Sequence, residues 1–359
     1  MPTLSIRQLV KSYDSTPILR GVDLELERGE TIVLAGVNGC GKSTLLHCIA
    51  GLVAPDAGRI VVEGQDQLPL SSAQRPIGFV TQVGGYFENL TVEANLQSSL
   101  RSQGLSRDEC SRRIDWILEL LQLAQVKNRL VQTLSGGQAQ RVAFGRGLIR
   151  KPKVLLLDEP FNHLDREIRI QLQQELHRIQ KELELSILMV THQFENALEQ
   201  ADRIALLSEG KIQQLDVPET IYRQPARREI AYQFGRFPPI LETLEIDRVS
   251  KTFEFCGKRL SMDSFSRLAS IPQLSALRWI GIRPEALQWH HESSKLDSNL
   301  QWSAQITAIR FGGDVALIDC LVHGRTWTLP MDLAHRSQWQ VGQSILLSAD
   351  PNHFFFLSE

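Results

Sequence analysis

A glycine-rich stretch, GVNGCGKST at residues 36–44, contains the residue types that hold a nucleotide phosphate. Gly36, Gly41, Lys42 and Ser43 follow the spacing G-x-x-x-x-G-K-[ST], between a predicted strand and a predicted helix. Glycines allow backbone amides to turn towards phosphate oxygens, and the start of the helix adds a positive dipole end. We expect Lys42 to reach the β and γ phosphates and Ser43 to offer its hydroxyl to Mg²⁺.

Two neighbouring carboxylates end a second apolar strand, VLLLDEP at residues 154–160. Asp158 is placed to hold Mg²⁺. Glu159 can position and deprotonate a water molecule that attacks the γ-phosphorus. The alternative is a pair of solvated acids at a strand end, which the phosphate loop earlier in the chain makes the weaker interpretation.

A third motif, LSGGQAQR at residues 134–141, predicts a second phosphate-binding helix end in the same chain. Ser135 can cap a helix, while Gly136 and Gly137 leave amide N–H groups uncovered. One γ-phosphate could in principle be held by both helix ends of a single chain.

Taken together and in this order, the three motifs resemble the signature of ATP-binding-cassette ATPases, over about residues 3–235. The resemblance implies an α/β P-loop NTPase fold with an antiparallel β arm and a helical subdomain at about residues 88–150. It also implies a homodimer, in which the LSGGQ motif of one chain binds the γ-phosphate of ATP held by the other.

The same resemblance assigns roles to single residues. Tyr13 resembles the aromatic residue that stacks on adenine, although it could simply be a loop tyrosine. Gln82 resembles the glutamine that touches Mg²⁺ and water and senses the membrane partner, and His192 the histidine that contacts the γ-phosphate. The implied catalytic residues are Glu159, His192, Lys42 and Gln82, and the implied Mg²⁺ ligands are Ser43, Gln82 and Asp158. The implied ATP-binding residues are Tyr13, Gly36, Asn38, Gly39, Cys40, Gly41, Lys42, Ser43, Thr44, Ser135, Gly136, Gly137, Gln138 and Asp165.

Some positions depart from the family pattern or call for an explanation. Asn162 and His163 stand where the loop before Asp165, called the D-loop, usually has small residues. Gly145 and Gly147 stand where the family has small helix-forming residues. Each glycine lowers helix stability by about 1 kcal/mol relative to alanine, which indicates close packing at these positions. Cys40 lies beside a helix start that favours a thiolate, so we expect a reactive thiol.

The elements that position these motifs alternate between strands and helices, which predicts a mostly parallel sheet with helices on both faces. A turn is predicted at residues 14–21, and a helix from Lys42 to about Ala50, ending at Gly51. Apolar residues recur every three or four positions from Leu164 to Leu183, as in a long amphipathic helix. Strands are predicted at residues 3–10, 22–27, 31–36, 58–64, 77–82, 154–160, 186–192 and 203–215.

The pattern changes near residue 236, and we place the boundary there, between a nucleotide-binding domain at 1–236 and a small all-β domain at 237–359. Short alternating strands predict a barrel or sandwich. The segment GIRPEAL at 281–287 resembles part of the OB-like regulatory domain, called TOBE, of one importer subgroup. Five of the six tryptophans fall in this domain, and we expect them to fill its core rather than to line a ligand site. We expect His290 and His291 to be solvated in a loop.

Composition excludes several classes of protein. The 359 residues carry 39 basic and 41 acidic side chains. The chain therefore lacks the excess of positive charge that would indicate nucleic-acid binding. Five scattered cysteines argue for a reducing compartment and against disulfides or zinc. The N-terminus lacks a signal-peptide pattern, and no apolar run approaches the ~20 residues that span a bilayer.

The sequence therefore predicts the ATPase subunit of a bacterial importer, with ATP and Mg²⁺ as cofactors. It would act at the cytoplasmic face of the inner membrane through permease subunits and, indirectly, a substrate-binding protein. Ferric iron is the first expectation for the substrate, followed by polyamine or sulfate. The alternative is a cassette ATPase in nucleic-acid repair or translation, which would call for a coiled-coil insertion, zinc cysteines or tandem cassettes. A P-loop kinase would lack LSGGQ, and an exporter would usually carry fused membrane helices.

Overall fold

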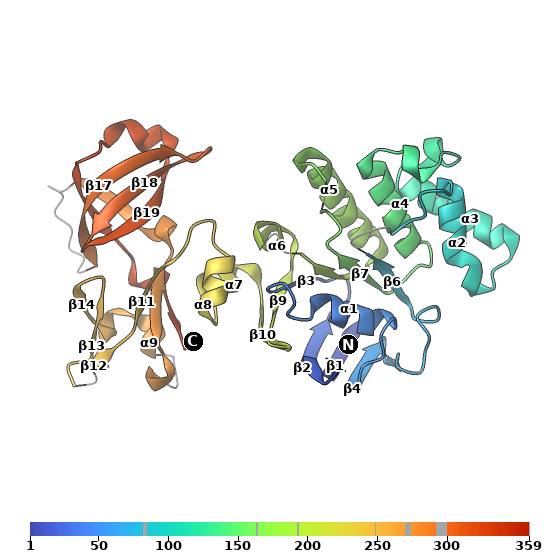
Figure 1. Cartoon of the computed structure of the whole chain (residues 1–359), viewed down its shortest axis with the longest axis horizontal. Helices are drawn as coiled ribbons and strands as arrows, with labels where there is room; N and C mark the ends of the chain where they lie inside the picture. Colours follow the sequence, from blue (N-terminus) through green and yellow to red (C-terminus); the bar gives the residue numbers. More distant parts are fainter. Residues whose placement is uncertain are drawn as a thin grey trace. The chain divides into compact units, whose positions relative to one another are not determined.

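The computed structural model describes residues 1–81, 85–162, 164–191, 194–247, 249–269, 274–291 and 300–358. The chain divides into two compact units, Met1–Pro218 and Glu219–Glu359 (Figure 1). The division falls before the boundary predicted near residue 236. The reason is that Arg283 of the second unit donates hydrogen bonds to the carbonyls of Tyr222 and Ala231, which holds the segment before residue 236 in that unit.

A six-stranded sheet forms the centre of the first unit, in the order β10-β9-β3-β8-β7-β6. Only β10 pairs antiparallel, and the other neighbours are parallel. Every residue of β3, β7 and β8 is buried, as expected for a sheet covered on both faces. The bounds are β3 (Thr31–Ala35), β6 (Ile77–Val80), β7 (Val154–Asp158), β8 (Ser186–Val190), β9 (Arg203–Ser208) and β10 (Lys211–Asp216).

An antiparallel sheet of four strands, in the order β2-β1-β4-β5, forms the predicted β arm. Asp14 and Ser15, with φ of 44° and 68°, make a two-residue hairpin turn between β1 and β2. The turn predicted at residues 14–21 was therefore too long, because β2 already begins at Thr16. The bounds are β1 (Leu4–Tyr13), β2 (Thr16–Leu26), β4 (Ala57–Val62) and β5 (Gln65–Asp66).

Helix α1 (Lys42–Ala50) shares one apolar core with both sheets, and it ends at Gly51 as predicted. The helical subdomain contains α2 (Val92–Leu100), α3 (Arg107–Leu120) and α4 (Gly136–Leu148), drawn in cyan to green in Figure 1. The long amphipathic helix is α5 (Arg166–Leu183), which an ion pair of 2.9 Å between Arg141 and Glu175 joins to α4. Helix α6 spans Phe194–Gln200.

The second unit begins with short helices and continues as three antiparallel sheets, in the orders β11-β15-β21, β12-β13-β14 and β16-β20-β17-β18-β19. Trp302, Trp327 and Trp339 are buried in one apolar core, as the sequence predicts. The bounds are α7 (Pro218–Arg223), α8 (Arg228–Gln233), α9 (Ser266–Ala269), β11 (Ile240–Thr243), β12 (Ile246–Asp247), β13 (Thr252–Phe255), β14 (Lys258–Ser261), β15 (Trp279–Ile282), β16 (Gln288–His291), β17 (Gln301–Phe311), β18 (Val315–Val322), β19 (Arg325–Asp332), β20 (Ser344–Ser348) and β21 (Phe354–Leu357).

The prediction that the two adjacent histidines lie in a loop was wrong, although His291 is exposed, as predicted. His290 and His291 lie in β16, not in a loop. His290 hydrogen-bonds to Ser348 at 2.9 Å, and His291 stacks on Trp339 with ring centroids 4.8 Å apart. These contacts come from strand pairing with β20 and from core packing, which the local sequence does not encode.

Candidate active site

The phosphate loop connects the end of β3 to the start of α1. Gly36 has a φ of 153°, and a Cβ there would lie 2.2 Å from the carbonyl oxygen of Leu207, so only glycine fits. The buried Lys42 ammonium donates hydrogen bonds to the carbonyls of Gly36 at 2.8 Å and Val37 at 3.0 Å. The lysine is therefore folded over its own loop, where phosphates bound by the loop amides would meet its charge.

The β1–β2 hairpin borders this loop. A Cβ on Gly41 would lie 3.0 Å from a methyl carbon of Leu19 and 3.1 Å from one of Ile18, both in β2. Tyr13 ends β1 in the same hairpin and is 44% exposed. Lys11 lies over the ring, with its ammonium 5.6 Å from the ring centroid.

Asp158 ends β7 and is 8% exposed. Burial raises the pKa of its carboxyl, and the neighbouring Glu159 acts in the same direction. A hydrogen bond from Ser43, together with the positive charge of His47 and Lys42, lowers the same pKa and partly offsets burial. A hydroxyl and a buried carboxylate in contact are oxygen donors of the kind that Mg²⁺ binds, so these residues fit the predicted metal.

The environment of Cys40 differs from the one that the sequence predicts. Burial raises the pKa of its thiol, and this effect exceeds the opposing influence of the Lys42 charge and of the backbone amides. The raised pKa disfavours the thiolate that the helix start alone would favour, and the reactivity of Cys40 stays a prediction.

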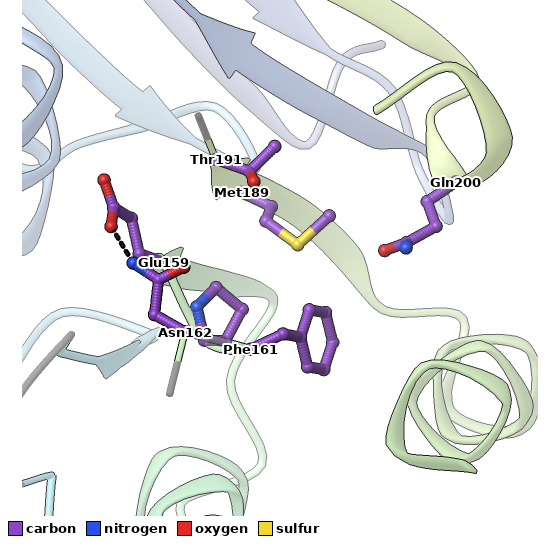
Figure 2. A pocket seen from close by; sticks show the side chains of 7 residues that line it. Glu159, Phe161, Asn162, Met189, Thr191 and Gln200 are labelled. Carbon is purple, nitrogen blue, oxygen red and sulfur yellow. Dashed lines mark hydrogen bonds between the residues drawn. The ribbon is translucent and has the colours of Figure 1, made fainter. Parts of the chain in front are cut away.

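Glu159 follows β7 in a left-handed conformation, with a φ of 48°. Its N–H donates to the carbonyl of Val190 in β8 at 3.0 Å. The side-chain amide of Asn162 donates a hydrogen bond to Oε2 of Glu159, as Figure 2 shows. Sequence reasoning marked Asn162 as unusual but did not predict this contact.

The LSGGQ motif starts α4, as predicted. The Ser135 hydroxyl accepts from the N–H of Gln138 at 3.3 Å, and the Gln138 side chain accepts from the N–H of Ser135 at 3.2 Å. This reciprocal cap leaves Ser135 and Gly136 exposed at the helix start. Asp165 caps α5 by accepting from the N–H of Ile168 at 2.9 Å, so it has a local structural role in the single chain.

The phosphate loop and the two carboxylates lie at the carboxyl ends of parallel strands, the usual place for a ligand in an open α/β sheet. Ser43, Lys42 and His47 of α1 all act on the carboxyl of Asp158 at the end of β7, and His47 was not predicted. Gln82 and His192, both predicted to be catalytic, lie outside the described residues, as does His163.

A groove of about 420 Å³ opens between β6, α2 and α4. Its lining includes Ser98, Ser99 and Ser102 from the α2 region, and Arg146 and Arg150 from the α4 region. Arg146 donates to the carbonyl of Gly85 at 2.6 Å, and its guanidinium lies 4.4 Å from the ring centroid of Phe87. Burial lowers the pKa of both arginines.

In the parts of the chain that the structure describes, no helix is long and apolar enough to cross a membrane.

Comparisons with known proteins agree with this fold and site. Residues 19–162 match the ABC transporter family, and residues 280–357 match the TOBE domain. The chain is 33% identical to the spermidine/putrescine import ATP-binding protein PotA of Chromobacterium violaceum over 320 residues, 88% of this chain and 87% of the relative. It is also 33% identical to the sn-glycerol-3-phosphate import ATP-binding protein UgpC 3 of Rhizobium johnstonii over 333 residues, 90% of this chain and 91% of the relative.

Among solved structures, cbiO1 of Clostridium perfringens, part of the ABC transporter complex cbiONQ, superposes with a TM-score of 0.56 at 28% identity. The match covers 61% of this chain and 90% of that one. Fold, motifs and relatives together define an ATP-binding-cassette ATPase. The chain belongs to the ABC transporter family, in the group of import ATPases that carry a TOBE domain, and it is an ATP-hydrolysing transport ATPase.

Proposed function

We propose that two copies of this chain power a bacterial importer from the cytoplasmic face of the inner membrane, attached through a separate permease. The observation that carries the proposal is the joint presence, in one chain, of the phosphate loop with its Ser43–Asp158 contact and the exposed, capped start of α4. The import functions of the relatives support the same assignment. They do not favour a repair or translation ATPase.

In this proposal the residues at the sheet edge divide the chemistry. The amides of the phosphate loop and Lys42 bind the β and γ phosphates. Ser43, Asp158 and Gln82 would hold Mg²⁺, which neutralises phosphate charge when bound. Glu159 takes the proton from the attacking water, and His192 contacts the γ-phosphate.

The second phosphate-binding end acts across a dimer. Ser135, Gly136, Gly137 and Gln138 of one subunit bind the ATP held by the other, because Ser135 and Gly136 are exposed at a helix start that favours anions. Asp165 in the D-loop then lies at the interface between the subunits. ATP binding closes the dimer, and hydrolysis reopens it.

The groove beside α2 and α4 is the proposed seat of the permease. It is bordered by β6, which ends at Val80, two residues before Gln82 in the sequence. Its polar lining and two arginines suit a polar or acidic helix end better than a lipid surface.

The cargo is chosen by the permease and the binding protein, not by this chain. Polyamine is the first cargo to test, since polyamine and glycerol phosphate importers are among the relatives. The earlier expectation of ferric iron finds no support in them.

The experiment is reconstitution of the chain with the permease and binding protein that co-purify with it. We expect cargo-loaded binding protein to stimulate ATP hydrolysis. Replacing Ser102→Trp in the groove should abolish that stimulation but leave basal hydrolysis unchanged. The matched control is Ser111→Trp, on exposed surface of α3 outside the groove lining. Stimulation that survives Ser102→Trp would contradict the proposed docking site.

A further inference from the structure

We infer that Asn162 is a positioning residue that orients the Glu159 carboxylate for hydrolysis. The inference rests on the proposed role of Glu159 as the base. Its starting point is the hydrogen bond from the Asn162 amide, Nδ2, to Oε2 of Glu159 (Figure 2). An amide that holds one carboxylate oxygen fixes the plane of the carboxylate, and so the direction in which the base faces the water.

The backbone keeps the two residues at this spacing. The N–H of Asn162 donates to the carbonyl of Glu159 at 3.2 Å, which closes a four-residue turn with Pro160 at its second position. Glu159 is in turn anchored by its own N–H to Val190 of β8. Main-chain hydrogen bonds hold both ends of the turn, so the backbone itself places the Asn162 side chain beside the Glu159 carboxylate.

The turn is also tied to the helix that carries the LSGGQ motif. Phe161 is 7% exposed, and its ring packs edge-on against Phe144 of α4 with centroids 6.2 Å apart. The placement of the Asn162 amide therefore depends on α4, which begins at the exposed phosphate-binding end. This contact gives α4 a physical route to the proposed base within a single chain.

A small cavity lies beside the pair. The cavity beside them, lined also by Met189, Thr191 and Gln200, measures only about 10 Å³ (Figure 2). This is close to the room that one water molecule needs.

The chemistry of position 162 follows from charge and length. An asparagine amide donates to an ionised carboxylate without adding charge. An aspartate would place a second carboxylate beside Glu159, and two neighbouring carboxylates resist ionising together. A small residue, usual at this position in the family, lacks a donor that reaches so far.

The test measures steady-state ATP hydrolysis by the full chain as a function of ATP and pH. We expect Asn162→Ala to lower kcat about tenfold, the loss of roughly one charge-assisted hydrogen bond, with KM for ATP unchanged. Asn162→Asp should lower kcat further and move the acid limb of the kcat profile to higher pH. The control Gln174→Ala, which removes an exposed amide from α5, should match the wild-type chain.

A double-variant cycle separates positioning from a general structural effect. If Asn162 acts through Glu159, adding Asn162→Ala to Glu159→Gln should not further lower the residual single-turnover rate. Three results would each overturn the inference. The double variant could have a lower single-turnover rate than Glu159→Gln, Asn162→Ala could keep the wild-type kcat, or Asn162→Asp could leave the pH profile unshifted. Wild-type turnover by Glu159→Gln alone would instead overturn the proposed role of Glu159.

Discussion

At the scale of single residues, the buried environment of Asp158 disfavours its ionised carboxylate when no metal ion is bound. The folded chain raises the pKa of this buried carboxyl, so it binds a proton more tightly than the unfolded chain does. Its contribution to stability is thus fully present at low pH and is lost as pH rises through the raised pKa. A divalent cation held by Asp158 and Ser43 would compensate the buried charge.

We therefore predict opposite effects of Asp158→Asn on stability and activity. Without metal at neutral pH, the variant should have a higher Tm than the wild-type chain, and the difference should shrink at acidic pH. ATP hydrolysis should fall at least a hundredfold, because a proposed metal ligand is lost. Thermal unfolding across pH measures the first effect and a phosphate-release assay the second. A lower Tm for the variant at neutral pH would contradict this account of Asp158.

Glu159→Gln should keep ATP binding and lose hydrolysis by roughly 10²–10⁴-fold, the usual contribution of a general base. The side chain keeps its size and an oxygen that accepts from Asn162, so the loop should fold as before. Nucleotide titration by fluorescence and phosphate release measure the two properties. Retained turnover would remove Glu159 from the mechanism.

The residue roles that could be predicted from the sequence are those that depend only on neighbouring residues. The cap by Ser135 needs only the neighbouring Gln138, so the sequence contains all its determinants. The state of the Cys40 thiol and the Asn162–Glu159 contact depend on burial and on the exact path of a turn. Those properties arise from tertiary packing, which the motif spacing does not specify.

At the scale of elements, glycines allow α4 to pack closely against α2 and β6. The sequence predicted close packing at Gly145 and Gly147, and a Cβ on Gly145 would lie 2.8 Å from a methyl carbon of Leu96. A Cβ on Gly78 of β6 would lie 2.4 Å from the carbonyl oxygen of Gly147. Gly78 was not predicted, because its partner lies on another element far along the chain.

Gly78→Ala should therefore lower the free energy of unfolding by about 1–3 kcal/mol, as overpacking against rigid backbone does. Gly147→Ala is the matched control. Its Cβ would meet side-chain carbons of Val80 at 3.1 Å and Leu155 at 3.2 Å, which can shift, and alanine favours a helix. Urea unfolding of both variants checks the difference. Equal losses would show that the backbone contact is not the determinant.

At the scale of the whole molecule, the two units have separate cores, and the short helices α7 and α8 belong with the second. Arg283 is 3% exposed, and burial lowers the pKa of its guanidinium to about 10. The same group lies 4.5 Å from the ring centroid of Tyr222 and donates to backbone carbonyls. The alternating pattern predicted the β domain, and this arginine, from a motif in the tail, bonds to α7 and α8 in the same unit.

A fragment of residues 1–218 should still bind ATP, because every described phosphate-handling motif lies within it. A fragment of residues 1–236 should also bind ATP but aggregate more readily. In it, Ala231 of α8 loses the cover of Phe355 and Leu357. Nucleotide binding and size-exclusion chromatography test both. A folded 1–218 fragment that fails to bind ATP would contradict this division.

The central claim is that each ATP is held between the phosphate loop of one chain and the LSGGQ helix end of another. The most direct measurement is the molar mass of full-length Glu159→Gln by light scattering, with and without saturating ATP and Mg²⁺. We predict a monomer without nucleotide and a dimer with it, and Ser135→Arg in the same background should remain monomeric. A Glu159→Gln chain that binds ATP but stays monomeric over a wide concentration range would contradict the claim.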